Sequence, residues 1–555
     1  MSERISLEQM LSARERRADI QKKMLEEAGD SCLVCLTMNI AGDVKRTEMI
    51  RLLFYHGVRD FEDRIAREIG DLGVRVSSRK IIDEPTGCEA FWLITEDTQG
   101  DGPENRLEIR QKDEQVCEQD AEKSVGQKIK KLCEGIEDAF PAARLFDFDV
   151  LIKNTEPSGF PNKDNTLIKK SEATDIKSED DRSTSGTASG NEYIDTGAPE
   201  NSAAFIPKKL SRERARRCLI CERDAAECAR NRTHGLAAVK EATGALLEDF
   251  CAKLLSDCAC NALYKELYTT PKPGLVDRAN NGAHLDMDIP LFERSVESLR
   301  PYFYDVAKLG MRRCSMKELR LRGLAAEKDM FETTGGVNTH KGIIYSMGLL
   351  VAGAGQALNG LSTHPVTEEN TSAFPCISSY NMSRLEDTDL MHSDVDNINN
   401  FNALVTSSVH NASLLALEDA EEMMRIFSES PETNGARVMK QYGVKGATAE
   451  AASGFPSAVY TYERIKTYSM DAGALALCDS MSRLEDTNIL HRGGREGLEF
   501  VQKSASAISA LPISERREAL TGLDEEMIKK NLSPGGSADM LALAFLLCRL
   551  DELFI

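Results

Sequence analysis

A glycine pair followed by a histidine and a lysine is the first feature of this chain that could do chemistry. Residues 331–342 read Phe-Glu-Thr-Thr-Gly-Gly-Val-Asn-Thr-His-Lys-Gly and run directly into an apolar stretch. N–H groups at a helix N-terminus lack partners inside the helix, glycines admit an anion closely, and a lysine adds positive charge. The pattern predicts a phosphate site at a helix start. Because Gly342 follows Lys341, it is not the nucleoside-triphosphate loop G-x-x-x-x-G-K-[ST].

Three further polar clusters interrupt the second half of the chain, at residues 270–286, 484–494 and 531–539. Each mixes glycine with carboxylate, amide or cationic side chains at an expected helix boundary. Ordinary helix capping would explain such compositions one at a time. Three of the eight histidines nevertheless lie in the four clusters. If the clusters converge, they supply anion donors, carboxylates for Mg²⁺ and candidate bases.

Two aspartates alternate with apolar residues in Arg144–Leu151, which reads Arg-Leu-Phe-Asp-Phe-Asp-Val-Leu. In a strand this alternation places Asp147 and Asp149 on one face. A carboxylate pair can hold Mg²⁺ against substrate phosphates, as in nucleotidyl transfer. The alternative interpretation is an edge strand with a solvated acidic face.

Three cysteines and a histidine follow the pattern C-x₂-C-x₆-C-x₅-H at Cys218, Cys221, Cys228 and His234. This spacing is compatible with a small tetrahedral zinc site. The alternative is a helix that buries Cys221 and Cys228, which are seven residues apart and would share a face.

Composition excludes several classes of protein. The net charge of −21 argues against nucleic acid as a partner, since phosphate backbones need a cationic surface. The first residues lack the apolar core of a signal peptide, and no apolar run approaches the roughly 20 residues that span a membrane. The 15 cysteines are odd in number and are expected to be reduced thiols. We therefore expect a cytoplasmic protein without a membrane partner.

The chain divides into two predicted domains, an N-terminal α+β domain at residues 1–240 and an all-α domain at 241–555. Ser6 and Gln9 form an expected capping box, and residues 154–206 are a polar, flexible insertion. A helix at Met49–Ile69 is expected to be interrupted near Gly57. The expected strands are Cys32–Ile40, Cys88–Thr95 and Ala143–Lys153, and helical periodicity dominates after residue 236.

The first 240 residues resemble the holo-citrate lyase synthase family, the apo-citrate lyase phosphoribosyl-dephospho-CoA transferases. The shared stretches are Ser12–Arg17, Met38–Lys45, Phe54–Gly57, Arg144–Leu151, Arg216–Glu222 and Thr233–His234. Asp43 stands where the family often has proline, and the insertion after Lys153 is longer than usual. The resemblance implies a nucleotidyltransferase-like domain in which a serine of the citrate lyase acyl carrier protein attacks a phosphate of the donor and expels pyrophosphate.

The second half resembles triphosphoribosyl-dephospho-CoA synthase over about 300 residues. The shared motifs are Lys272–Arg278, Asn281–Met287, Thr334–Gly342, Asp486–Asn488 and Ser533–Asp539. The resemblance implies that the 2′-hydroxyl of 3′-dephospho-CoA attacks the ribose of ATP and adenine leaves. Together the two resemblances imply a bifunctional transferase that builds and attaches the citrate lyase prosthetic group, with Mg²⁺ as cofactor.

The candidate residues follow from these motifs. The catalytic candidates are Asp147, Asp149, Asp277, His284, Asp286, His340 and Asp486. The candidates for binding substrate and phosphate are Lys45, Arg144, Lys272, Gly274, Arg278, Gly335, Gly336, Asn338, Thr339, Lys341, Arg492, Ser533, Gly535 and Gly536. Asp147 and Asp149 are the expected Mg²⁺ ligands, and the cysteine and histidine set is the possible zinc site.

Two alternatives stay open. In the first alternative, only the helical half is catalytic, and the N-terminal half is a docking module for the acyl carrier protein. In the second, the cofactor serves a related lyase or decarboxylase. An Asp147 and Asp149 metal site favours catalysis in the N-terminal half, because a docking surface does not require one.

Overall fold

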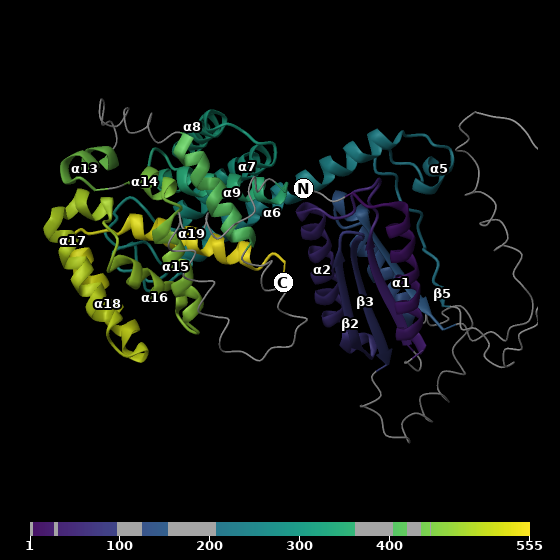
Figure 1. The fold of residues 1–555 in the computed structure, drawn as a ribbon. Helices are drawn as coiled ribbons and strands as arrows, with labels where there is room; N and C mark the ends of the chain where they lie inside the picture. Colours follow the sequence, from purple (N-terminus) through teal and green to yellow (C-terminus); the bar gives the residue numbers. More distant parts are fainter. Residues whose placement is uncertain are drawn as a thin grey trace, which may run out of the picture.

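The computed structural model describes residues 4–26, 31–96, 125–153, 207–360, 403–418, 434–444 and 446–554. A small antiparallel sheet with its helices precedes a helical half (Figure 1). No strand follows Lys209 within these ranges. The expected mix of α and β structure, followed by helices, is therefore confirmed. The predicted insertion at 154–206 lies outside the described residues.

The sheet has the strand order β2-β3-β1-β4-β5. Its strands are β1 (Ser31–Met38), β2 (Val74–Glu84), β3 (Gly87–Glu96), β4 (Phe146–Ile152) and β5 (Lys208–Lys209). All neighbours pair antiparallel, and the β1–β4 register sets Thr37 opposite Asp147 and Cys35 opposite Asp149. Because β5 pairs only with the end of β4, most of β4 lies at the open edge of the sheet.

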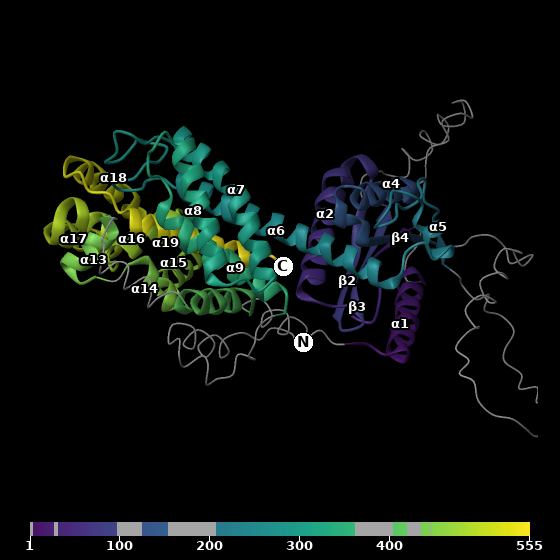
Figure 2. The same ribbon diagram turned by 90° about the horizontal axis from the view of Figure 1, so that it is seen from above.

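Helices cover both faces of this sheet. Helix α1 (Leu7–Glu26) packs with Leu25 on the face that carries Leu33, Phe91 and Leu151. Helices α2 (Glu48–Leu72) and α4 (Val125–Glu137) cover the other face, and Figure 2 shows the layers from above. The capping box that starts α1 is confirmed, since Ser6 N–H donates to Gln9 Oε1 at 2.7 Å and Gln9 N–H donates to Ser6 Oγ at 3.1 Å.

Helix α2 runs without a break, so the expected interruption near Gly57 is wrong. A Cβ at Gly57 would lie 2.7 Å from ring atoms of Phe146. The glycine therefore lets the helix approach β4 closely, and its cost in helix propensity is offset by this packing.

One long helix, α6 (Leu236–Tyr268), belongs to both halves of the molecule (Figure 2). The Phe250 ring on α6 stacks on Phe140 with centroids 5.5 Å apart and meets the His56 ring edge-on at 5.2 Å. The C-terminal segment also returns to α2, where Arg59 donates to the carbonyl oxygens of Glu552 at 2.8 Å and Leu553 at 3.0 Å. The expected boundary between residues 240 and 241 falls inside α6.

In the helical half, α6 packs against α7 (Ile289–Met311), α9 (Lys341–Leu358) and α19 (Gly535–Asp551). The other helices of this half are α8 (Met316–Thr333), a helix at 403–418, α13 (Asn434–Tyr442), α14 (Ala447–Ala452), α15 (Pro456–Thr467), α16 (Ala472–Met481), α17 (Thr487–Ser509) and α18 (Ile513–Lys529). The apolar helix α9 is the nearest approach to a membrane span in the sequence, yet its side chains form core. Within the described residues, no helix is long and apolar enough to cross a membrane.

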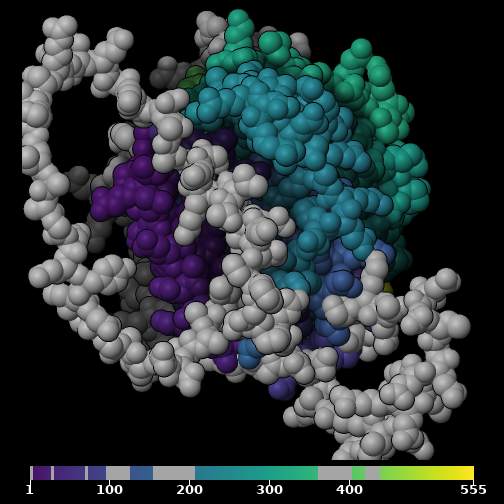
Figure 3. All heavy atoms as spheres, turned by 90° about the vertical axis from the view of Figure 1, so that its right-hand side faces the viewer, coloured from purple at the N-terminus to yellow at the C-terminus, as the bar shows by residue number. Residues whose placement is uncertain are grey.

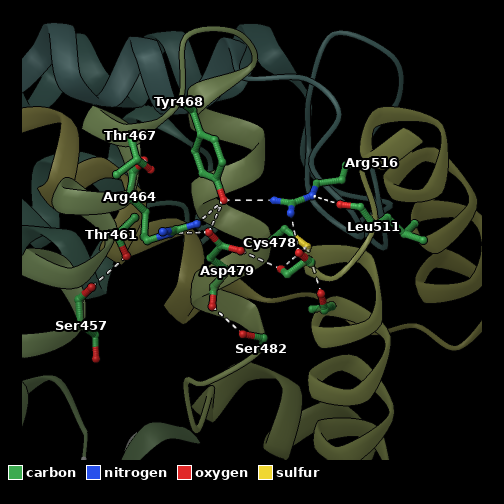
Figure 4. Close-up of polar contacts among 12 residues, drawn as sticks. Ser457, Thr461, Arg464, Thr467, Tyr468, Cys478, Asp479, Ser482, Leu511 and Arg516 are labelled. Atoms are coloured by element: carbon green, nitrogen blue, oxygen red, sulfur yellow. Dashed lines mark hydrogen bonds and ion pairs between the residues drawn. The ribbon is translucent and has the colours of Figure 1, made fainter. Parts of the chain in front are cut away.

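A buried carboxylate joins the helices that carry residues 484–494. Asp479 on α16 accepts from Arg464 Nε at 2.6 Å, from the Tyr468 hydroxyl at 2.5 Å and from Ser509 Oγ at 2.7 Å. Figure 4 shows Arg464 and Tyr468 meeting at Asp479 and Arg516 reaching the Tyr468 hydroxyl, 3.2 Å away. The network thus links α15 to α18 just before the Asp486 turn.

Replacing Asp479 with asparagine is expected to lower the free energy of unfolding by about 3 kcal/mol. The amide removes the charge that pairs with Arg464 and sets an N–H₂ group against donors. Urea unfolding of the full chain measures the change. The matched control is Asp257→Asn, which removes a more exposed ion pair with Arg300 and should cost less than about 1 kcal/mol. Equal effects in the two variants would contradict the network's role.

Candidate active sites

Three of the four polar clusters meet through direct side-chain contacts. His284 Nε2 lies 2.8 Å from Ser533 Oγ, which joins residues 270–286 to residues 531–539. The Arg492 guanidinium donates to the Ala283 carbonyl oxygen at 2.9 Å and to Asn531 Oδ1 at 3.0 Å. Segments that are more than 200 residues apart in the chain therefore form one region of the surface.

Gly274 shows how closely these segments approach. Its φ of +73° is a conformation that glycine adopts without strain, and a Cβ there would lie 2.4 Å from the Leu532 carbonyl oxygen. Its N–H donates to Asp524 Oδ1 at 2.8 Å. Any larger residue at position 274 would push the two segments apart.

The fourth cluster joins through Gly342 and His340. A Cβ on Gly342 would lie 2.5 Å from Asp539 Oδ2, so the start of α9 touches the first turns of α19. Burial, together with the smaller effect of the nearby Lys272 charge, lowers the pKa of His340 to about 3. All four glycine-containing segments thus converge on one site.

A buried lysine lies at the centre of this site. The Lys272 side chain is 2% exposed, and its ammonium lies 2.5 Å from Glu266 Oε1 on α6. A buried ammonium requires a carboxylate partner, because the loss of hydration is otherwise too costly. Glu266 therefore supplies the partner that the buried Lys272 ammonium needs.

Three carboxylates, Glu266, Asp486 and Asp539, form what we call the carboxylate cluster. Burial raises the pKa of Asp539 well above its usual range, and the charges of Asp486 and Glu266 raise it further. Burial also raises the pKa of Asp486, against the effect of its hydrogen bonds. Carboxylates that repel one another in a buried site favour a bound proton or cation.

Asp486 also has a structural task at the N-terminus of α17. Its Oδ1 accepts from Asn488 N–H at 2.9 Å and Ile489 N–H at 3.3 Å, and its Oδ2 accepts from Ser537 N–H at 2.8 Å and Oγ at 3.1 Å. Gly536 lies against the same carboxylate, since its Cβ would be 3.1 Å away. The aspartate thus orients α17 and α19 about the site.

Asp277 shapes its own turn. One carboxylate oxygen accepts from Lys272 N–H at 2.9 Å, and the other accepts from Ala279 N–H at 2.7 Å and Asn280 N–H at 3.1 Å. Asp286 is exposed, and its charge acts on His284 and Arg492. Capping chemistry therefore accounts for the contacts of Asp277, while Asp286 lies at the rim.

Residues 334–342 end one helix and start the next. The N–H of Gly336 donates to the Phe331 carbonyl oxygen at 2.8 Å, so Gly335 and Gly336 terminate α8. Asn338 Oδ1 accepts from Lys341 N–H at 3.2 Å at the start of α9. The Lys341 ammonium lies 2.8 Å from Glu327 on α8, where it is half-buried.

Three remaining candidates lie around these turns. The Thr339 hydroxyl lies 2.7 Å from Ser295 Oγ. The Arg278 guanidinium covers the Tyr268 ring at 4.8 Å. Gly535 opens α19, where a Cβ would lie 2.5 Å from Asn488 Nδ2. Beside Tyr268 lies an open hollow of about 610 Å³, lined by Tyr264, Tyr268, Glu293, Arg294, Glu297, Ser298 and Thr333.

In the N-terminal half, Asp147 and Asp149 lie on one face of β4, while Phe146, Phe148 and Val150 are buried on the other. The predicted alternation is therefore confirmed. The side chains of Asp147 and Asp149 are 33% and 26% exposed, and each uses Oδ1 in an ion pair, Asp147 with Arg216 and Asp149 with Lys209, the latter at 2.5 Å.

Lys45 and Arg144 lie at the end of the sheet where β1 ends and β4 begins. The Lys45 ammonium donates to the Ile40 carbonyl oxygen, and burial lowers the pKa of Lys45 from its usual range. Arg144, in a 3₁₀ turn at Pro141–Leu145, donates to the Cys218 carbonyl oxygen at 3.1 Å. Arg144 lies two residues before β4, which begins at Phe146, three residues later than expected.

The cysteine and histidine set is drawn together in space. The ligand atoms of Cys218, Cys221, Cys228 and His234 all lie within 4.8 Å of one another. Only Cys228 is helical, on α5 (Ala225–Arg230), so the alternative of one helix that buries Cys221 and Cys228 is wrong. All thirteen cysteines in the described ranges are free thiols.

Comparison with known proteins identifies both halves. The model of the family described as ATP:dephospho-CoA triphosphoribosyl transferase matches residues 252–555, more than half of the chain. The chain belongs to this family. A second model, described as apo-citrate lyase phosphoribosyl-dephospho-CoA transferase, matches residues 5–100 and 200–250. In this chain a segment that matches a second transferase family therefore precedes the first one.

Relatives share this arrangement or its second half. Protein CitXG of Haemophilus influenzae is 28% identical over 97% of this chain and 95% of its own length. The 2-(5''-triphosphoribosyl)-3'-dephosphocoenzyme-A synthase of Pectobacterium atrosepticum is 35% identical over 52% of this chain and 86% of its own. The synthase of the same name from Haemophilus ducreyi is 32% identical over 58% of this chain and 97% of its own. The fusion of the two transferase domains places the chain in citrate lyase prosthetic-group biosynthesis.

The sequence patterns do not single out several residues of the candidate site in the helical half. Glu266 lies in the middle of a helical pattern, and Asp539 was noted only as the end of a motif. Asp524 and Ser295 were not singled out, although Ser295 Oγ lies 2.7 Å from His340 Nδ1. Asp539 does carry a signal in the sequence, because it is an acidic residue in the first turns of an otherwise apolar helix, where the helix dipole favours negative charge.

Stability of the triphosphoribosyl transferase half is expected to fall in mild acid because of His340. Its pKa is about 3 in the fold and about 6.5 in an unfolded chain. Between these values only the unfolded state binds the proton, so stability is complete above pH 6.5 and falls by about 1.4 kcal/mol per pH unit below it. The difference in unfolding free energy between wild type and His340→Gln should therefore shrink from pH 7 to pH 5. A constant difference would contradict this assignment.

Proposed function

We propose that the chain is a bifunctional enzyme whose helical half makes 2′-(5″-triphosphoribosyl)-3′-dephospho-CoA from ATP and 3′-dephospho-CoA. One observation carries the proposal: the four glycine-containing segments converge around a buried Lys272 and the carboxylate cluster. A site that combines a buried ammonium with clustered carboxylates suits a substrate that carries both a triphosphate and a reacting sugar. The names of the relatives of this half support the same substrates.

The proposed reaction is a substitution at the ribose of ATP. The 2′-hydroxyl oxygen of dephospho-CoA bonds to the anomeric carbon, the bond from that carbon to adenine breaks, and all three phosphates stay on the ribose. The hydroxyl proton passes to a carboxylate, for which Asp539 is suited by its raised pKa. The remaining carboxylates stabilise positive charge that develops on the ribose ring.

The residues fit a divalent cation. Both oxygens of Asp486 accept hydrogen bonds from N–H or hydroxyl groups, and the negative charges of Asp486 and Glu266 both act on Asp539. Asp486 and Glu266 would therefore hold Mg²⁺, which leaves Asp539 to take the proton. A bound Mg²⁺ supplies positive charge for the triphosphate. Lys272 and Arg492 supply the cationic side chains of the site.

For the N-terminal half we propose nucleotidyltransferase-type chemistry. A serine hydroxyl of the citrate lyase acyl carrier protein bonds to a phosphorus of the triphosphoribosyl donor, and pyrophosphate leaves. Asp147 and Asp149 each keep Oδ2 outside their ion pairs, and would hold Mg²⁺ that neutralises the leaving group. Arg144, Lys45 and Arg216 provide cations for the phosphates.

A second candidate for this half is a docking module for the carrier protein. The observation that favours it is that both aspartates are paired with cations, Asp147 with Arg216 and Asp149 with Lys209. A docking module would bind the carrier without modifying it. The cofactor could then serve the carrier of a related lyase or decarboxylase instead.

The test of the helical half uses the purified full chain with ATP, dephospho-CoA and Mg²⁺. Free adenine and a triphosphoribosyl product should appear together, and neither should form without dephospho-CoA. Mass spectrometry detects both. Release of ADP or AMP without adenine would overturn the proposal. Adding the carrier protein then separates the two candidates for the N-terminal half, because only a transferase adds mass to the carrier serine.

A further inference from the structure

The segment between β5 and α6 folds around sulfur atoms. From residue 207 to residue 235, only Cys218 and Cys228 are buried. The segment contains no long helix or strand, only β5, an isolated bridge between Arg217 and Asp224, and the short α5. So few apolar contacts do not hold a chain of this length in one conformation. Something other than a hydrophobic core must therefore fix it.

We propose that Cys218, Cys221, Cys228 and His234 bind a structural zinc ion. Cys221 Sγ lies 3.5 Å from Cys228 Sγ and 3.3 Å from His234 Nε2. Zn–S bonds of about 2.3 Å and a Zn–N bond of about 2.0 Å at tetrahedral angles require separations of about 3.8 and 3.5 Å. These two distances agree within a few tenths of an ångström, and all four ligand atoms lie within 4.8 Å of one another. Four protein ligands fill the tetrahedron, so the zinc is structural.

The backbone around the first two cysteines has the form that ligating thiolates need. Ile220 N–H donates to Cys218 Sγ at 3.5 Å, and Cys218 N–H donates to the Arg223 carbonyl oxygen at 2.8 Å. N–H groups directed at sulfur stabilise its negative charge. The Asp224 side chain caps α5 and thereby orients Cys228, with Asp224 Oδ1 2.6 Å from Ala226 N.

The alternative explanations fit less well. A disulfide requires sulfurs about 2.05 Å apart, and any single pair would leave a third thiol and the histidine without a role. Cysteines of a hydrophobic core would all be buried, but Cys221 is partly exposed, as is the neighbouring His234.

Helix α5 lies to the right of the sheet in Figure 1, so this segment is on the side that faces the viewer in Figure 3.

A zinc ion at this position would fix arginine side chains beside β4. Arg216 precedes Cys218 by two residues and pairs with Glu137 at 2.8 Å and with Asp147. The Cys218 carbonyl oxygen accepts from Arg144. His234 lies two residues before α6, the helix shared by both halves. The ion would thus fix the position of Arg216 and the start of α6.

The experiment measures metal directly in the full chain. Protein purified with zinc and then passed into metal-free buffer should retain about one zinc per chain by elemental mass spectrometry. Cobalt substitution should give the intense visible absorption of a tetrahedral site with thiolate charge-transfer bands. Cys221→Ser and His234→Ala should lose the zinc, and Cys260→Ala, a buried cysteine on α6, should keep it.

Folding is checked separately by far-ultraviolet circular dichroism and by trypsin digestion. Chelation of zinc from the wild-type chain should expose Arg212 to Arg232 to trypsin while the helical half stays intact. Three results would overturn the proposal: no zinc and no cobalt bands in the wild type, zinc retained by both ligand variants, or a disulfide among the three cysteines in freshly purified protein. None of these readouts depends on either transfer activity.

Discussion

Replacing Asp539 with asparagine is expected to reduce adenine release at least about a hundredfold while the chain becomes no less stable. The carboxylate is proposed to take the proton of the attacking hydroxyl, and an amide is too weak a base to do so. Burial and the charges of Asp486 and Glu266 keep the pKa of Asp539 well above its usual range. The charged form therefore destabilises the fold at pH 7, and a neutral isostere removes that cost. Adenine release and urea unfolding of the same preparation measure the two effects.

The control for this prediction is Asp524→Asn. Asp524 is another carboxylate whose pKa is raised, mainly by burial. Its oxygens accept from Gly274 N–H at 2.8 Å and from Asn280 Nδ2 at 2.7 Å. An amide would set N–H₂ against one of these donors, so stability should fall by about 1–3 kcal/mol. If Asp539→Asn loses stability as Asp524→Asn does and keeps its activity, then Asp539 is a structural residue.

Loss of carrier modification by several orders of magnitude is expected for Asp147→Asn and for Asp149→Asn. An amide of the same shape is a poor Mg²⁺ ligand and does not help to neutralise the departing pyrophosphate. Both side chains are partly exposed on β4, so the variants should fold. The measurement is the mass gained by the acyl carrier protein when premade triphosphoribosyl-dephospho-CoA is supplied. Adenine release by the helical half should be unchanged.

The matched control is Asp60→Asn, which removes an ion pair of 2.8 Å with Arg64 on α2. This pair lies on the helix layer away from the aspartate face of β4, so carrier modification should stay at the wild-type rate. If Asp147→Asn and Asp149→Asn also modify the carrier at the wild-type rate, then β4 is an edge strand with a solvated acidic face and not a metal site. If the wild-type chain itself binds the carrier protein but does not modify it, the result favours the docking module.

Features that depend on near neighbours in the chain could be predicted from the sequence. The two-residue period of β4 places Asp147 and Asp149 on one face, and the Ser6–Gln9 box starts α1 where expected. The change along the chain from mixed α and β structure to helices could also be predicted. These patterns follow from the geometry of a single helix or strand, and tertiary contacts seldom reverse them.

Tertiary structure alone decided which side chains share a site. His284 meets Ser533 although they are 249 residues apart, and Lys272 pairs with Glu266, which looked like an ordinary helical residue. The apparent helix break at Gly57 became a close contact with Phe146. Burial, pairing of charges and close approach depend on the whole packed chain, so local periodicity carries no information about them. The sequence determined the elements and their chemistry, and packing determined which carboxylates surround the buried lysine.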